Sequence, residues 1–335
     1  MEQLNVCPST LAVGFSTYSP AALRLLFDGV SVSHILPFDS PNSESDDGGD
    51  YANHIGRISL SGVQPKAGLV LNADHQLVKP AAEERGRFIL KPAPSSYALI
   101  ERLFCPANEH LSMQIASQVY HIDTAANALC FFKDGEAAYI TRRFDVAPDG
   151  TKYQQEDLAS LAGLTKANGG SDYKYSNLSY EECAELVRRY TTAASVEVLK
   201  FFRIVVFNYL ILNDDAHLKN FSIINRGDGE YHLAPAYDLI NTSLHLYEPR
   251  IFALDKGLFR EGMNLSDTHS VCRADFEEFG HRIGLSSRLI KRELDFFATE
   301  HPLAKQLVEN SFLSDKLKHY YWQSYNYRRK TLLAP

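Results

Sequence analysis

The hydrophobic and polar positions divide the chain into a strand-rich first part and a helix-rich second part. In the first part, short apolar runs end at glycine, proline or charged turns, which is the pattern of β-strands. These runs lie at 67–71, 87–91, 129–132 and 138–141. Between them, residues 108–121 repeat apolar side chains at helical spacing. The first part therefore predicts a sheet with one helix.

The second part is dominated by helical patterns. Residues 196–212 are apolar on nearly all faces, which predicts a buried central helix. Ser179, with Glu182 three positions later, forms a capping-box pattern that opens another helix. Two apolar runs around Gly227 and Gly229 predict a hairpin over 221–233. We further expect a helix beginning at 155, a loop over 166–177 and three helices after 275.

This order of a sheet-rich part followed by a helical part is the order found in kinase-like folds. We therefore predict an α+β, two-lobed protein-kinase-like fold. The predicted N-lobe covers residues 1–145 and the predicted C-lobe covers 146–335. A fold of this kind does not establish a function, which has to come from the site residues.

Composition and charge indicate where the protein is located and which partners it can bind. The 335 residues carry a net charge of −7, which argues against nonspecific nucleic-acid binding, so direct DNA binding is not expected. Five scattered cysteines without a CxxC pair are typical of reduced thiols in a cytosolic protein. The N-terminus lacks a signal-peptide pattern, and the apolar runs are too short to span a membrane. We expect a soluble, cytoplasmic protein that does not associate with membranes.

The residues with the clearest chemical meaning follow the predicted central helix. The segment 213–220, NDDAHLKN, places acids, a histidine, a lysine and an asparagine in one loop. The predicted hairpin then returns the chain to Asp238. Phosphoryl transfer uses an aspartate near the attacking hydroxyl, with an asparagine and an aspartate on Mg²⁺. The alternative is that these polar residues are simply good loop formers.

Two upstream features complete a phosphoryl-transfer site. Lys91 ends an otherwise apolar strand, where it can hold nucleotide phosphates or can simply extend to water at a sheet edge. Glu109, at the start of the next helix, is its natural ion-pair partner. The loop 59–68 contains glycines that let backbone amides approach an anion, although an ordinary hairpin turn has the same composition.

The chain resembles the HipA-type serine/threonine kinases, the toxins of bacterial toxin–antitoxin systems. The resemblance covers roughly residues 55 to 245, and NDDAHLKN and APAYD are its most specific motifs. The matching stretches occur in the family's order: ISLSGVQPKAGLVL (58–71), FILKPAP (88–94), ANEHLSMQIA (107–116), RRFD (142–145), QEDLASLAG (155–163), NDDAHLKNFSI (213–223) and LAPAYDLI (233–240).

The resemblance implies roles for the residues of the polar loop. Asp215 matches the catalytic base, and the family spacing selects it over its neighbour Asp214. His217 lies in the same loop, and Lys219 is expected to face the transferring phosphate. Asn220 and Asp238 are expected to ligate Mg²⁺.

The resemblance also implies an ATP site and a regulatory loop. Matches to nucleotide-binding positions are Lys66, Lys91, Glu109, Phe144 and Tyr237, together with Arg142. Relatives often carry an acid where Arg142 stands, so adenine is expected to contact backbone groups there. Ser59 matches an autophosphorylated serine, and Ser61 is a second candidate. A phosphate on either serine adds negative charge beside the ATP phosphates and is expected to oppose ATP binding.

About 57 residues precede the serine–glycine loop, fewer than in full-length HipA. The chain is thus most similar to HipT, the short toxin of three-component HipBST systems. This similarity implies a small HipS-like antitoxin that replaces the missing N-terminal subdomain, and a DNA-binding HipB-like protein. It also implies phosphorylation of an aminoacyl-tRNA synthetase, with the tryptophanyl enzyme favoured.

Two other functions stay open on the residues alone. One is a catalytically inactive kinase-like binding module, and the other is a metal-dependent hydrolase built on the acids and His217. The basic, aromatic segment 316–330 is expected to pack on the helical lobe rather than to bind RNA.

Overall fold

A computed structural model describes residues 4–41, 65–81, 86–96, 98–265 and 271–333. The N-terminal part is built around a five-stranded antiparallel sheet with the strand order β2-β1-β3-β5-β4. Its strands are β1 (Ala67–Leu71), β2 (Leu77–Val78), β3 (Phe88–Lys91), β4 (Asn127–Phe131) and β5 (Ala137–Arg142). Strand β3 lies in the centre, which places Lys91 in the middle of the sheet.

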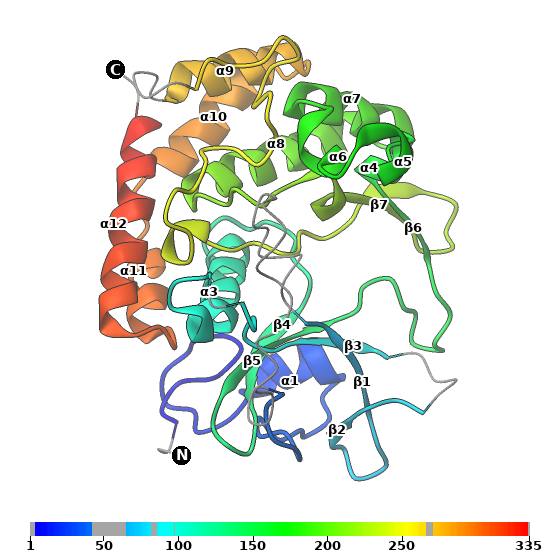
Figure 1. Ribbon diagram of the computed structural model, residues 1–335, viewed down its shortest axis with the longest axis vertical. Helices are drawn as coiled ribbons and strands as arrows, with labels where there is room; N and C mark the ends of the chain where they lie inside the picture. Colours follow the sequence, from blue (N-terminus) through cyan, green and yellow to red (C-terminus); the bar gives the residue numbers. More distant parts are fainter. Residues whose placement is uncertain (1–3, 42–64, 82–85, 97, 266–270, 334–335) are drawn as a thin grey trace.

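Two helices cover opposite faces of this sheet (Figure 1). Successive side chains of a strand point to opposite faces. On β4, Ala128 and Cys130 share a core with helix α1 (Pro20–Phe27), whereas Leu129 and Phe131 share a core with helix α3 (Cys105–Gln118). Helix α3 is buried over most of its length, because it lies between the sheet and the C-terminal helices.

The C-terminal part is a helical lobe with a second, three-stranded sheet in the order β6-β7-β8. The sheet consists of β6 (Gln154–Asp157), β7 (Ser222–Asn225) and β8 (Tyr231–Leu233). The α-helices of this lobe are α4 (Leu158–Leu161), α5 (Lys166–Gly169), α6 (Tyr173–Ser176), α7 (Tyr180–Tyr190), α8 (Ala194–Leu210), α9 (Arg273–Arg282), α10 (Ser287–Ala298), α11 (Pro302–Asn310) and α12 (Asp315–Thr331). Short 3-10 turns are η1 (Arg102–Phe104), η2 (Leu218–Asn220) and η3 (Thr242–Leu244).

The two-lobed α+β architecture predicted from the sequence is confirmed. The apolar helix α8 is buried on nearly every turn, and the 221–233 hairpin is β7–β8. The capping box is also present, because the backbone N–H of Glu182 donates to Ser179 Oγ at 3.2 Å and the Glu182 carboxylate accepts from the Ser179 N–H at 2.9 Å. None of the helices that the structure describes combines the length and the apolar character that crossing a membrane requires.

Three element predictions in the C-lobe were wrong. The expected helix from 155 begins only at Leu158, because residues 154–157 pair with β7 as an edge strand. The expected loop over 166–177 contains the short helical turns α5 and α6. The described chain after 271 forms four helices instead of three.

The aromatic segment near the C-terminus packs inward, as predicted. Tyr321 and Tyr325 of α12 are buried, and their hydroxyls meet Ser112 Oγ at 3.0 Å and the Tyr120 hydroxyl at 2.5 Å. Both contacts reach α3 or the residues just after it. Helix α12 thereby ties the helical lobe to the helix that supports the N-terminal sheet (Figure 1).

Candidate active site

The polar loop that follows α8 is held in place by Asn213. Leu212 has a left-handed backbone conformation with φ 52°, which turns the chain sharply after the helix. The Asn213 side-chain amide donates to Asn208 Oδ1 at 2.9 Å and to the Asp238 backbone oxygen at 3.1 Å. Its carbonyl oxygen accepts from the Asp215 N–H at 3.2 Å. One asparagine therefore joins the central helix, the polar loop and the Asp238 segment.

Lys91 brings the two lobes together at a single buried ammonium group. Its Nζ donates to Glu109 Oε1 at 2.5 Å and to Asp238 Oδ1. The Lys91 side chain is only 5% exposed, and it lies 5.1 Å from the centroid of the Tyr139 ring. The prediction that Glu109 is the ion-pair partner of Lys91 is consistent with this geometry, and Asp238 is a second partner.

Asp238 is the most heavily engaged acid of the site. Its second oxygen, Oδ2, accepts from Asn220 Nδ2 at 3.1 Å and lies 3.7 Å from Lys66 Nζ. Asp238 also has a left-handed backbone conformation with φ 56°, which is uncommon for a residue other than glycine. Such strain concentrates at functional sites, where the surrounding contacts hold it.

Burial and charge act in opposite directions on these groups. Burial alone would raise the pKa of Asp238, but Lys91 and Lys66 outweigh it and hold this pKa well below its usual range. Burial likewise would lower the pKa of Lys91, but Asp238 and Glu109 raise it above its ordinary value. The pKa of Glu109 is raised, because its burial and the nearby Asp238 charge exceed the effect of Lys91.

The two adjacent acids of the loop, Asp214 and Asp215, have different hydrogen-bond partners. Asp214 Oδ2 accepts from the backbone N–H of Arg250 at 2.9 Å, so this carboxylate anchors a neighbouring loop. Asp215 Oδ1 accepts from the hydroxyl of Tyr175 at 2.7 Å, and its backbone oxygen accepts from His217 N–H at 2.8 Å. The choice of Asp215 over Asp214 as the catalytic base stays a prediction.

His217 is buried and meets a lysine that the sequence did not single out. Lys174 Nζ lies 3.0 Å from His217 Nε2, and the rings of Tyr175 and His217 form an edge-on contact at 5.1 Å. Burial, reinforced by Lys174 and opposed by Asp215, lowers the pKa of His217 to about 4. The imidazole is therefore neutral at physiological pH.

The comparisons with known proteins place the chain in a family. Residues 58–303 match the family model described as the HipA-like C-terminal domain. The chain belongs to this family. The match contains the polar loop, Lys91 and Asp238, so the geometry described above lies within the conserved domain of HipA-like proteins.

The relatives carry kinase names. A Haemophilus influenzae protein named as a kinase is 28% identical over 76% of both chains. Two Sinorhizobium fredii proteins, Y4mE and Y4dM, also carry kinase names, and they are 31% and 29% identical over 56% and 70% of this chain. The chain spans only 43% and 56% of those two relatives' lengths.

Two solved structures share the fold. HipA of Shewanella oneidensis, solved with HipB and its operator DNA, matches with a TM-score of 0.65 and 19% identity over 82% of this chain and 65% of that chain. The Helicobacter pylori proinflammatory kinase CtkA matches with a TM-score of 0.50 and 15% identity over 79% and 93%. The chain therefore has the kinase-like fold of the HipA proteins.

Two residues expected in the HipA-like site form other contacts in the described residues. Lys219 Nζ pairs with Asp157 Oδ2 at 2.9 Å, and this hydrogen bond raises the pKa of Lys219. Arg142 forms a two-pronged pair with Asp28 at 2.5 and 2.9 Å, beyond the end of α1. The roles of the Lys219 and Arg142 side chains toward ATP stay predictions, and the Arg142 geometry favours a backbone contact over a side-chain contact.

The two expected aromatic residues lie together. The rings of Phe144 and Tyr237 are 5.6 Å apart, and the Tyr237 hydroxyl donates to the backbone oxygen of Lys219 at 2.9 Å. Contact of Phe144 and Tyr237 with the adenine of ATP stays a prediction. Ser59 and Ser61 lie outside the described residues, so their phosphorylation also stays a prediction.

The donor set of the site fits Mg²⁺. Mg²⁺ in phosphoryl-transfer sites is bound by one or two protein oxygens, with the remaining positions taken by phosphates and water. Asn220 and Asp238 each carry such an oxygen. The Asn220 amide nitrogen donates to Asp238, and its Oδ1 accepts from the His217 N–H at 3.1 Å. Among the described residues, groups of three or more His, Cys, Asp or Glu side chains arranged for a metal are absent.

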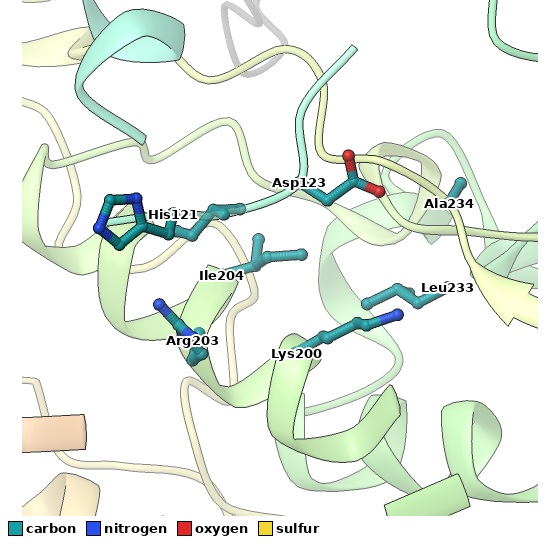
Figure 2. A pocket seen from close by; sticks show the side chains of 8 residues that line it. His121, Asp123, Lys200, Arg203, Ile204, Leu233 and Ala234 are labelled. Carbon is teal, nitrogen blue, oxygen red and sulfur yellow. The ribbon is translucent and has the colours of Figure 1, made fainter. Parts of the chain in front are cut away.

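A cavity of about 180 Å³ lies beside the segment that leads to Asp238 (Figure 2). It is lined by His121, Ile122, Asp123, Lys200, Arg203, Ile204, Leu233 and Ala234. Its cations already have partners, because Lys200 pairs with Glu197 at 2.9 Å and Arg203 with Glu293 at 3.5 Å. This cavity lacks the residues of the polar loop, so it is not the phosphoryl-transfer site.

Proposed function

We propose that this protein is an ATP- and Mg²⁺-dependent serine/threonine protein kinase of the HipA type. The observation that carries this proposal is the convergence on Asp238. Lys91 contacts one carboxylate oxygen of Asp238, and Asn220 contacts the other. Asp215 lies in the same short loop as Asn220. This combination supplies a phosphate-binding cation, a metal-binding pair and an acid for the attacking hydroxyl.

In the proposed reaction, the acceptor hydroxyl oxygen forms a bond to the γ-phosphorus of ATP. The bond between the γ-phosphorus and the β–γ bridging oxygen breaks, and ADP leaves with that electron pair. Asp215 orients the hydroxyl and accepts its proton. Lys91 and Lys66 hold phosphate oxygens, and bound Mg²⁺ supplies neutralisation of the developing charge. The work of the protein is positioning, since it forms no covalent intermediate.

We further propose that the substrate is an aminoacyl-tRNA synthetase, and that the tryptophanyl enzyme is the favoured candidate. Phosphorylation of such an enzyme would block aminoacylation and slow growth. Family membership and the HipA-like fold support a toxin role. Autophosphorylation at Ser59 or Ser61 would then switch the kinase off by placing charge beside the ATP phosphates.

Two protein partners belong to the proposal. The first is a small HipS-like antitoxin and the second is a DNA-binding HipB-like protein, both acting in the cytoplasm. The solved complex of the Shewanella HipA with HipB and operator DNA supports the second partner by similarity of fold alone.

The deciding experiment measures phosphate transfer by the purified protein. Wild type and Asp215→Ala are incubated with γ-labelled ATP and Mg²⁺, alone and with each purified synthetase. We expect label on the wild-type loop serines and on one synthetase, with none in the variant. Mass spectrometry locates the phosphoserines. Absence of any label, together with a melting temperature that ATP does not change, would favour the inactive binding module. Hydrolytic activity without ATP would favour the metal-dependent hydrolase.

A further inference from the structure

A short segment that the sequence suggested was a loop contacts three consecutive residues of the polar loop. Lys174 and Tyr175 lie on the helical turn α6, and Tyr180 begins helix α7. Tyr175 contacts the carboxylate of Asp215, and Tyr180 donates to the backbone oxygen of Ala216 at 2.9 Å. The third contact joins Lys174 and His217. These three contacts define what we call the α6 clamp: Lys174, Tyr175 and Tyr180 on Asp215, Ala216 and His217.

The contact between Tyr175 and Asp215 is well formed. The hydroxyl donates to Oδ1 over 2.7 Å, and both side chains are buried, with Tyr175 at 2% and Asp215 at 7% exposure. A hydrogen bond to a carboxylate in a buried site is stronger than one between neutral groups. Because the donor comes from a rigid aromatic side chain, it restricts rotation of the Asp215 carboxylate. The orientation of that carboxylate decides whether it meets the acceptor hydroxyl.

The backbone and the ring of Tyr175 are held by further contacts. The backbone oxygen of Tyr175 accepts from the Asp255 N–H at 3.0 Å, and its own N–H donates to Asp172 at 2.8 Å. Its ring also contacts the Lys174 ammonium at 4.9 Å and the His217 ring at 5.1 Å. Tyr175 is therefore held by its backbone while its hydroxyl holds Asp215.

The contact between Lys174 and His217 sets the state of the imidazole. An ammonium group only donates, so His217 Nε2 accepts and the ring proton lies on Nδ1. His217 Nδ1 is buried and has no hydrogen-bond partner in the part of the chain that the structure describes. Without the donor at Nε2, the imidazole would have no fixed tautomer. Because His217 lies two positions after Asp215 in a tight turn, its orientation affects the backbone that carries the acid.

We propose that Tyr175 and Lys174 are positioning residues for phosphoryl transfer, holding Asp215 and His217 in their working orientation. This inference rests on the proposed function, because it takes Asp215 to be the catalytic base of a kinase. The inference adds two residues, Lys174 and Tyr175. Their segment is separate from the polar loop, from Lys91 and from Asp238. Neither side chain is assigned a contact with ATP.

The test of Tyr175 compares two buried tyrosines that each lose one hydroxyl. Tyr175→Phe removes the contact to Asp215, whereas Tyr321→Phe removes a contact to Ser112 far from the loop. We expect kcat for the phosphoacceptor to fall about 10-fold in Tyr175→Phe, with KM for ATP within about twofold of wild type. Tyr321→Phe should lower the melting temperature by about as much as Tyr175→Phe does, and it should leave kcat unchanged.

The test of Lys174 uses two neutral replacements. Lys174→Gln keeps an N–H donor for His217, whereas Lys174→Met has none. We expect kcat to decrease in the order wild type, Gln, Met, again with little change in KM for ATP. This rescue by the donor separates positioning from a simple loss of charge.

Several results would overturn the inference. Unchanged kcat in Tyr175→Phe, an equal loss in Tyr321→Phe, or equal activity of the two Lys174 variants would each do so. If the Lys174 variants raise KM for ATP without a loss of kcat, Lys174 contacts the nucleotide. That result would also refute its assignment as a positioning residue. If wild type transfers no phosphate at all, the proposed function fails first, and the two failures are thereby distinguished.

Discussion

The side-chain amide of Asn220 donates to the carboxylate of Asp238 over 3.1 Å, which joins the two ends of the β7–β8 hairpin. The contact spans 18 positions of sequence. The two residues proposed to bind Mg²⁺ are therefore in contact. The side-chain oxygen of Asn220, the atom that would bind the ion, accepts from the His217 N–H at 3.1 Å.

We predict that Asn220→Ala raises the Mg²⁺ concentration required for half-maximal transfer by about 10-fold or more, because loss of a metal-binding partner commonly has this magnitude. The measurement is transfer rate against Mg²⁺ concentration at saturating ATP. Asn225→Ala is the matched control, since Asn225 lies at the other end of β7 and its side-chain oxygen accepts from the Gly227 N–H in the hairpin turn. An unchanged Mg²⁺ requirement in Asn220→Ala would remove Asn220 from the metal site.

The buried ammonium of Lys91 predicts a stability effect as well as a functional one. Lys91→Met leaves the buried carboxylate of Glu109 and the partly exposed carboxylate of Asp238 without their shared cation. Breaking a buried pair in this way is expected to cost about 3 kcal/mol of unfolding free energy. The variant should also lose the ATP-dependent rise in melting temperature.

A second variant separates these two effects. Lys91→Met combined with Glu109→Gln removes one of the stranded charges, so we expect stability to recover in part while ATP binding stays absent. Lys79→Met is the control, because Lys79 is exposed just after β2. ATP-dependent stabilisation that persists in Lys91→Met would contradict the assignment of this lysine to the nucleotide.

The neighbouring acids Asp214 and Asp215 give a matched pair of substitutions. Asp215→Asn keeps an oxygen for the Tyr175 hydroxyl but removes the charge that accepts a proton, so transfer should fall by at least about 100-fold. Asp214→Asn keeps an oxygen for the Arg250 N–H, so transfer should stay within about threefold of wild type. The measurement is single-turnover transfer at saturating ATP. A reversed order of the two variants would make Asp214 the base.

The parts of the fold that were predictable from sequence depend on local rules. Helix α8 is apolar on nearly all of its faces, and the β7–β8 turn contains Gly227 and Gly229, both with positive φ. Together they place Asp215 and Asp238 at opposite ends of one compact unit. Chain order and turn chemistry therefore predicted the helix and the hairpin that bring these two segments together.

The missed residues depend on contacts between distant segments. Tyr175 meets Asp215 across 40 positions, and Lys219 meets Asp157 across 62. The segment around Tyr175 is polar and contains glycines, which predicted a loop and gave no sign that one tyrosine turns inward. Periodicity cannot identify such a residue, because a four-residue helical turn is too short to show a period.

Arg142 tests a prediction that came from the family resemblance. Its guanidinium pairs with Asp28, so Arg142→Met should change the ATP-dependent melting shift by less than about 1 °C. The loss of a partly exposed pair should lower the unfolding free energy by about 0.5 kcal/mol. Asp28→Asn should produce a similar small decrease, and the two changes together should not add. A large loss of ATP binding in Arg142→Met alone would restore the side chain to the nucleotide site.

Two buried histidines, His110 within α3 and His245 just after η3, predict a pH dependence of stability. His110 Nε2 donates to the Ser9 oxygen at 2.7 Å, and its Nδ1 is buried without a partner among the described residues. His245 Nδ1 donates to the Ile100 oxygen at 2.9 Å, and its Nε2 accepts from Asn108 at 2.9 Å. Protonation would therefore add a buried charge to His110 and would set two donors against each other at His245.

Burial lowers the pKa of both histidines to about 4, below the value of about 6.5 for an unfolded chain. Between these two values the unfolded state binds more protons than the folded state, so stability must fall as the pH falls from 6.5 toward 4. At pH 5.5 each histidine should remove about 1.4 kcal/mol relative to pH 8.

Thermal or urea unfolding of the protein between pH 8 and pH 5 provides the measurement. We expect little change above pH 7 and a steady loss of unfolding free energy below pH 6.5. His245→Asn removes one titrating group, and should reduce this loss by about 1.4 kcal/mol at pH 5.5, even though the variant starts from a lower stability at pH 8. His319→Asn, at an exposed position on α12, should follow the wild-type curve. A His245→Asn curve parallel to wild type would show that His245 is already charged, or differently bonded, in the folded protein.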